Sequence, residues 1–114
     1  MNIAILTGRL TRDPEMRHTT SGTDVCTFTI AVDRQFKNAD GQREADFIRC
    51  VAFKQKASFI SQYFHKGDKI NLTGTIQTRS WDDANGTKQH ATEIVVDQAE
   101  FGESKRQAND LPDV

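Results

Sequence analysis

Residues 43–67, READFIRCVAFKQKASFISQYFHKG, decide the predicted fold, because a strand pattern changes here into a helix pattern. The first part, up to Phe53, is rich in the aromatic and small apolar residues that strands favour. From Gln55 to Lys66 the apolar residues fall at helical spacing, and Gly67 can adopt the left-handed conformation that commonly ends a helix. We therefore expect a strand followed by the only helix of the chain.

Strand patterns lie on both sides of this helix, separated by turn-forming clusters such as Asp40-Gly41. The predicted strands cover residues 2–10, 23–36, 43–53, 69–81 and 88–101. Three strands, a helix and two strands is the order of the OB-fold, an all-β, five-stranded, partly open Greek-key barrel. A five-stranded sandwich is the alternative, but a single helix between the third and fourth strands favours the barrel.

The 114 residues are enough for one domain, which we expect to cover residues 1–101, with a short disordered tail over 102–114. The sequence has no apolar run of membrane-spanning length, so a cytoplasmic location is expected. Cys26 and Cys50 lie in apolar, strand-like segments without metal-ligand spacing. We expect both to be buried free thiols.

The charge balance limits any interaction with a polyanion. The formal net charge is −1, and removing residues 102–114 leaves 13 basic and 13 acidic residues, which is net zero. Long-range electrostatic attraction is therefore weak. If the protein binds nucleic acid, local clusters of cations and base stacking must supply the affinity.

The strand at 43–53 has two faces of different character. One face carries two aromatic side chains with a cation between them, in the order Phe47, Arg49, Val51 and Phe53. The opposite face already supplies small apolar residues for a core. Exposed rings beside a guanidinium group suit nucleic-acid bases and phosphates. The alternative is a strand buried on both faces, and this segment by itself does not decide between them.

Trp81 and Arg79 repeat this pattern on another strand, where alternation places both on the outward face. The alternative is that strand twist folds Trp81 back over the hairpin to cover the core. Phe36 has the parity of core residues in its strand, although its place at a hairpin mouth resembles that of Trp81. Lys54 is placed to contact phosphate, but isolated lysines are usually only solvated.

The sequence gives little sign of catalysis. His18, His65 and His90 lie in unrelated segments, and there is no glycine-rich phosphate loop. The acidic pair Asp82-Asp83 is what a hairpin turn requires. We therefore expect a binding protein rather than an enzyme, with no metal and no cofactor.

From residue 1 to about 101 the chain resembles the bacterial single-stranded DNA-binding proteins. The matching motifs are Ile5-Leu6-Thr7-Gly8-Arg9-Leu10, Asp13-Pro14-Glu15-Met16-Arg17, Phe28-Thr29-Ile30-Ala31-Val32, Ala45-Asp46-Phe47-Ile48, Tyr63-Phe64-His65-Lys66-Gly67 and Gln77-Thr78-Arg79-Ser80-Trp81. The resemblance implies an OB-fold that assembles as a homotetramer. It also implies binding of single-stranded DNA without sequence preference, at the nucleoid, in replication, recombination and repair.

The resemblance also assigns roles to residues of this chain. Its stacking aromatics fall on Phe36, Phe47, Phe53 and Trp81, and its cationic positions fall on Arg49 and Arg79. Some family members carry tryptophan where this chain has Phe36 and Phe47, which keep a smaller stacking face. Residues 109–114 are similar to the acidic tip that recruits replication and repair proteins, but they lack its terminal Phe. That difference weakens the case for recruitment through this tail.

Two rival functions stay open. An OB-fold protein-interaction module, such as a primosomal accessory protein, would hold mainly a protein partner in its groove. An RNA-binding OB domain would use the same rings and cations, since RNA bases also stack.

Overall fold

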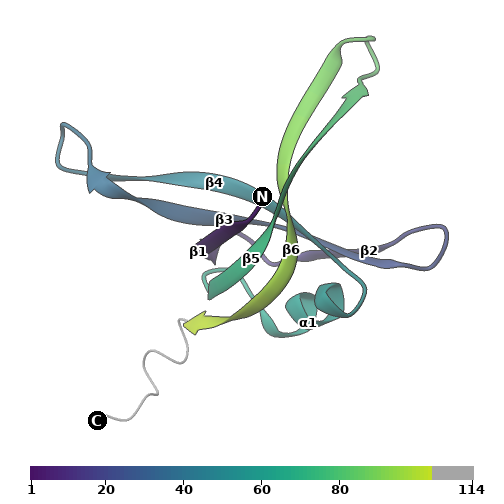
Figure 1. Ribbon diagram of the computed structural model, residues 1–114, viewed down its shortest axis with the longest axis horizontal. Coiled ribbons are helices and arrows are strands. Elements are labelled where there is room, and N and C mark those ends of the chain that lie inside the picture. The colour runs from purple at the N-terminus through teal and green to yellow at the C-terminus, as the bar shows by residue number, and fades with distance from the viewer. Residues whose placement is uncertain (104–114) are drawn as a thin grey trace.

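The computed structural model describes residues 1–103, which form a barrel of β-strands with one helix (Figure 1). The elements in chain order are β1 (Ala4–Leu10), β2 (Glu15–His18), β3 (Asp24–Lys37), β4 (Arg43–Phe53), α1 (Gln55–Tyr63), β5 (Lys69–Asp82) and β6 (Lys88–Glu103). β6 runs two residues beyond its predicted end at Phe101. Of the predicted tail, residues 104–114 lie outside the described residues.

The barrel closes because β1 pairs on both of its sides. The strand order is β1-β5-β6-β4-β3-β2, and β1 also pairs with β3 through Arg9 opposite Ala31. β4 and β6 form a parallel contact at Cys50 and Ile94, which joins the two halves of the chain. Within residues 1–103 this makes a closed five-stranded barrel with α1 between β4 and β5. The predicted OB-fold is confirmed, and the sandwich alternative was wrong.

The core lies inside the barrel and under α1. Its fully buried side chains include Ile30, Ile60, Phe64 and Ile70. α1 contributes Ala57 and Ile60, so its apolar stripe covers one end of the barrel. This arrangement leaves Phe47 of β4 and Trp81 of β5 exposed.

Cys26 and Cys50 are free and completely buried, as predicted. Burial raises the pKa of Cys26 to about 11 and that of Cys50 to about 12, because a thiolate is poorly solvated there. Both thiols therefore stay protonated and unreactive at neutral pH.

Two local predictions were inaccurate. β2 was not predicted, because Glu15–His18 is only four residues long and Met16 is its one apolar side chain. α1 ends at Tyr63 rather than at Lys66, because Phe64 is extended with φ −107° and ψ 141°. That conformation lets Phe64 enter the core, where its ring stacks on Phe101 at 4.3 Å between ring centroids.

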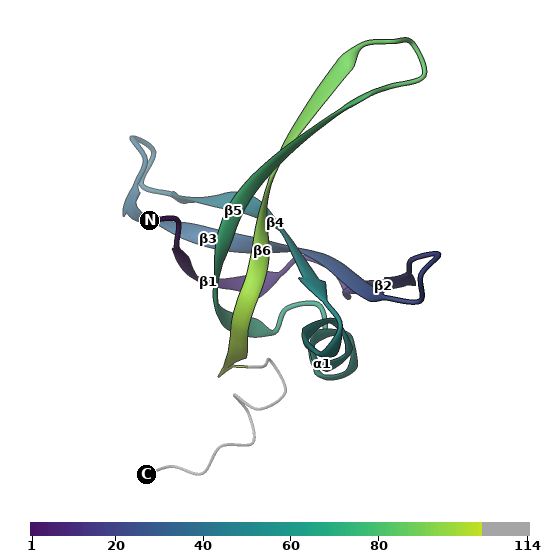
Figure 2. The ribbon, with the colours of Figure 1, turned by 45° about the vertical axis from the view of Figure 1, so that its right-hand side comes forward.

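The hairpin of β3 and β4 and that of β5 and β6 extend well beyond the barrel as arms (Figure 2). In the arm of β3 and β4, the side chains from Asp33 to Lys37 are exposed, and the strand pairing shifts register in this segment. Phe36 is 78% exposed, so the core position that its parity indicated was wrong, whereas its place at a hairpin mouth agrees with this exposure. Alternation identifies the two faces of a strand, but beyond the end of a barrel neither face has a core to cover.

Candidate nucleic-acid interface

The exposed aromatics of β4 and β5 lie beside two arginines on the outward side of the barrel. We call this set the outer face: Phe47, Arg49, Phe53, Arg79 and Trp81. The exposed fraction is 70% for Phe47 and 42% for both Phe53 and Trp81. β4 is therefore not buried on both faces, although Val51, on the same face as Phe47 and Phe53, is buried.

Adjoining hollows run along the outer face in the described part of the chain. One is lined by Phe47 and Arg49, and a second is lined by Arg49, Phe53 and Arg79. A third continues past Phe53 to Lys54. The first two share Arg49 and the last two share Phe53, so these residues mark a continuous track. Neither Phe36 nor Trp81 lines these hollows. Phe36 stands apart on the arm of β3 and β4, whereas Trp81 adjoins the track through its contact with Arg79.

A carboxylate lies between the two arginines of the outer face. Arg49 donates from Nε to Glu93 Oε2 at 2.7 Å, and Arg79 donates from Nε to Glu93 Oε1 at 2.5 Å. Burial alone would raise the pKa of Glu93, but the hydrogen bonds from Arg79 and Arg49 outweigh it and lower the pKa below its ordinary value. Glu93 is therefore ionised at neutral pH.

Arg79 also stacks on Trp81. Its guanidinium carbon lies 4.3 Å from the centre of the indole ring, which is a cation–π contact. The guanidinium group therefore covers one face of the ring. Trp81 is 42% exposed, so it is not folded back over the core as the alternative prediction required.

Lys54 joins β4 to α1 through an unusual backbone conformation, with φ 60° and ψ −126°. This region favours glycine, because a Cβ atom is strained there. The Lys54 N–H donates to Asp24 O at 2.8 Å, and its carbonyl accepts from the Ser58 N–H at 3.1 Å. The exposed side chain lies at the rim of the hollow that contains Phe53.

Sequence reasoning missed several polar residues of the track. Arg12 lines the hollow of Phe47, and Arg17 lines that of Phe53. Arg17 arrives through the pairing of β2 with β3, where it lies opposite Val25. Glu93 is 44 residues from Arg49, and no local signal links them. Only the parallel contact of β4 with β6 brings the two together.

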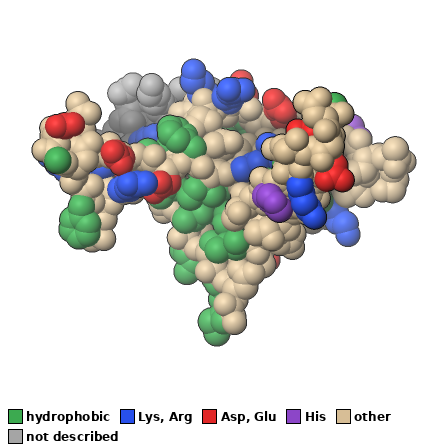
Figure 3. Space-filling model, turned by 90° about the horizontal axis from the view of Figure 1, so that it is seen from above, with side chains coloured by type: hydrophobic (Ala, Val, Ile, Leu, Met, Phe, Trp, Pro, Cys, Tyr) green, Lys and Arg blue, Asp and Glu red, His purple; other side chains and the backbone are tan. Residues whose placement is uncertain are grey.

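Charges of both signs are intermixed on the surface. Viewed from above in Figure 3, blue basic side chains alternate with red acidic ones, and no broad blue patch forms. On the arm of β3 and β4, Arg34 is bound by both Asp46 and Glu44. The hydrogen bond from Arg34 lowers the pKa of Asp46. Cations of this surface are thus partly matched by nearby carboxylates, in line with the formal net charge of −1.

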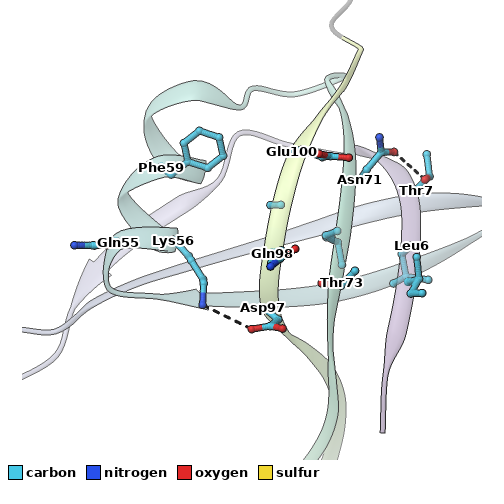
Figure 4. A pocket seen from close by; sticks show the side chains of 13 residues that line it. Leu6, Thr7, Gln55, Lys56, Phe59, Asn71, Thr73, Asp97, Gln98 and Glu100 are labelled. Carbon is cyan, nitrogen blue, oxygen red and sulfur yellow. Dashed lines mark hydrogen bonds and ion pairs between the residues drawn. The ribbon is translucent and has the colours of Figure 1, made fainter.

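A second exposed surface is aliphatic. We call it the β1 face: Ile3, Ile5 and Thr7 with Asn71 and Thr73 of β5. Ile3 is 61% exposed and Ile5 is 77% exposed. Beside it, β1, β5, β6 and α1 enclose a hollow of about 520 Å³ (Figure 4). There Thr7 Oγ1 donates to Asn71 Oδ1 at 2.8 Å.

β1 is also an incomplete edge of the barrel. Ala4 to Arg9 pair with β5 on one side, whereas only Arg9 and Leu10 pair with β3 on the other. The first half of β1 therefore has backbone groups on one side without a strand partner in the described chain. An apolar strand edge of this kind is a ready site for pairing with another strand.

Among the described residues, no helix is both long and apolar enough to cross a membrane. Nor do residues 1–103 bring together three or more His, Cys, Asp or Glu side chains that could hold a metal ion.

Comparison with known proteins agrees with this geometry. The sequence profile described as the Single-strand binding protein family matches residues 1–102. The chain is 49% identical over 106 residues to "Single-stranded DNA-binding protein 1" of Lactococcus lactis subsp. lactis, covering 93% of this chain and 71% of that protein. It is 46% identical over 108 residues to "Single-stranded DNA-binding protein" of Lactiplantibacillus plantarum, covering 95% of this chain and 54% of that protein.

A third relative covers the whole chain. "Single-stranded DNA-binding protein 1" of Staphylococcus aureus strain MSSA476 is 44% identical over 114 residues, covering 100% of this chain and 73% of that protein. The chain thus spans between about half and three quarters of the length of these relatives.

Proposed function

Because this chain belongs to the Single-strand binding protein family, we propose that it binds single-stranded DNA along the outer face. The observation that carries the proposal is the alternation of exposed rings and arginines along the track of hollows. Bases present flat π surfaces to the rings, and phosphates meet the cations. Every base has such a surface, so we expect little sequence preference.

The energies are adequate despite the neutral charge. A base stacked on an aromatic side chain contributes about 1–3 kcal/mol, so Phe36, Phe47, Phe53 and Trp81 offer about 4–12 kcal/mol before ordering costs. Arg49, Arg79 and Lys54 would contact phosphates beside these rings. Binding of this kind needs no cofactor, and we propose no catalytic reaction.

We further propose that the chain works as a homotetramer in the cytoplasm, on DNA exposed during replication, recombination and repair. The β1 face supports self-association, because it combines exposed aliphatic side chains with an incompletely paired strand edge. A two-fold contact there would pair the edges of two β1 strands and bury Ile5 of both copies.

Titration of the full chain with oligo-dT tests both proposals, since Trp81 is the only tryptophan. We expect quenching of its emission, and a solution mass of four chains with and without DNA. A matched oligo-U competitor should bind more weakly. Equal competition by RNA, or DNA binding only at millimolar concentrations, would contradict the DNA-binding proposal. A monomeric mass would contradict the tetramer alone.

A further inference from the structure

Glu93 is an acidic side chain at the centre of a surface proposed to bind a polyanion. Only 11% of its side chain is exposed, whereas Arg49 and Arg79 keep 47% and 49% of their exposure. The carboxylate thus lies at the floor of the hollow, and the guanidinium groups rise from it. A phosphate that approached either arginine would also approach this negative charge.

The contact has a defined geometry. Each oxygen of Glu93 accepts from the Nε atom of a different arginine. The Nη donors of Arg49 and Arg79 are not consumed by this contact and stay available to a ligand. Each guanidinium plane is held at one edge, which restricts the rotation of a long side chain that is otherwise costly to order.

The same carboxylate acts on Trp81 through Arg79. The guanidinium that Glu93 holds lies 4.3 Å from the centre of the Trp81 ring. One ring face is therefore occupied in the free protein, and a base can stack only on the other. A lone exposed tryptophan would sample several rotamers, whereas this stack presents one ring face in one orientation.

Glu93 also lowers the net charge of the site. Two guanidinium groups and one carboxylate sum to +1 rather than +2. Binding of single strands releases counterions in proportion to the phosphates neutralised, with a slope in log affinity against log salt of about −0.7 per phosphate. A protein whose arginines are shared with a carboxylate should therefore depend on salt less steeply than its cation count suggests.

We propose that Glu93 is a positioning residue of the outer face, which holds Arg49 and Arg79 as oriented planes and keeps them from acting as two free phosphate-binding charges. Through Arg79 it also fixes the face of Trp81 that receives a base. The inference rests on the proposed function, because it describes how the outer face binds DNA.

The test compares Glu93→Gln with wild type and with Glu100→Gln in the full chain. Glu100 is an exposed residue of the same strand, so its substitution makes the same charge change away from the outer face. For Glu93→Gln we expect tighter oligo-dT binding at low salt and a slope steeper by about 0.7, because the charge of the site rises by one. We also expect changed Trp81 emission in the free protein.

Glu100→Gln should keep the wild-type slope and emission. Equal slopes for the two variants, or a Glu93→Gln variant that only melts earlier, would overturn the positioning role. Loss of oligo-dT binding by wild type would instead overturn the proposed function, so the two failures are distinguishable.

Glu93→Asp keeps the inference testable if the glutamine variant does not fold. Aspartate retains the charge but is one methylene shorter, so it cannot hold both arginines in the same geometry. We expect a slope steeper than that of wild type by less than about 0.7, with altered Trp81 emission. A slope and emission equal to wild type would overturn the proposal.

Discussion

The outer face and the β1 face both expose large apolar side chains, but they differ in the chemistry around them. On the outer face the exposed groups are rings, and Arg79 lies directly on Trp81. On the β1 face they are branched aliphatics, Ile3 and Ile5, along a strand edge whose first half has no second strand partner within residues 1–103. Rings with cations match bases and phosphates, whereas aliphatics beside open backbone match another strand. The difference indicates two kinds of partner for one barrel.

Ile5→Glu should give the largest effect, because it places a charge in the proposed contact between two β1 faces. Burial of an isoleucine contributes about 1.5–3 kcal/mol, and a two-fold contact contains the residue twice, so the loss is about 3–6 kcal/mol per contact. Solution mass at micromolar concentration should fall below four chains. Ala84→Glu, at an exposed hairpin tip, is the control and should leave the mass unchanged.

Trp81→Ala tests the outer face. We expect oligo-dT affinity to fall by about 1–3 kcal/mol, because a stacking ring and the platform for Arg79 are both lost. Fluorescence anisotropy of a labelled oligonucleotide measures this loss without relying on tryptophan emission. Tyr63→Ala removes a half-exposed ring from α1 instead and should not change the affinity. Equal effects of the two substitutions would mean that the outer face is not the binding site.

Phe47→Ala and Phe36→Ala compare a ring that lines the track with a ring that stands on an arm. Phe47 lines a hollow of the track, so its loss should weaken oligo-dT binding by about 1–2 kcal/mol. Phe36 stands on an arm outside the hollows, so a smaller loss is expected with short oligonucleotides than with long ones. Both rings are exposed, and the free energy of unfolding should change by less than about 0.5 kcal/mol in each variant. Unfolding of Phe47→Ala would contradict its exposed position.

Lys54→Gly should give the smallest effect. It should stabilise the fold and weaken oligo-dT binding. Glycine relieves the positive φ, so the free energy of unfolding should rise by about 1 kcal/mol. The salt slope of oligo-dT binding should become shallower by about 0.7, because one cation is lost. Lys54→Ala removes the same charge but keeps a Cβ atom, so it should weaken binding without stabilising the protein. Stabilisation by alanine as well would rule out the strain argument.

Much of the fold was predictable because its signals are local. The period-two pattern of β3, the Asp40-Gly41 turn and the single helical stretch before Gly67 each depend on neighbours in sequence. The misplaced features lacked such a signal. β2 is too short to show a period, and α1 ends early because Phe64 is drawn into the core opposite Phe101.

The outer face was predictable only in part. Alternation placed Phe47, Arg49, Arg79 and Trp81 on the faces opposite the core, because side chains on a strand must alternate, but it did not decide whether those faces were also covered. It misplaced Phe36, since parity does not reveal where a barrel ends and an arm begins. It also gave no reason to associate Glu93 with either arginine.

The sequence by itself therefore determined the order of the five barrel strands and the helix, the OB-fold and the two faces of each strand. The tertiary structure alone decided how the side chains of the outer face combine. Closure of the barrel brings β4 and β6 together, and only that contact places one carboxylate between Arg49 and Arg79. The physical reason is range: periodicity and turns depend on adjacent residues, whereas a shared ion pair requires strands that are distant in sequence to meet in space.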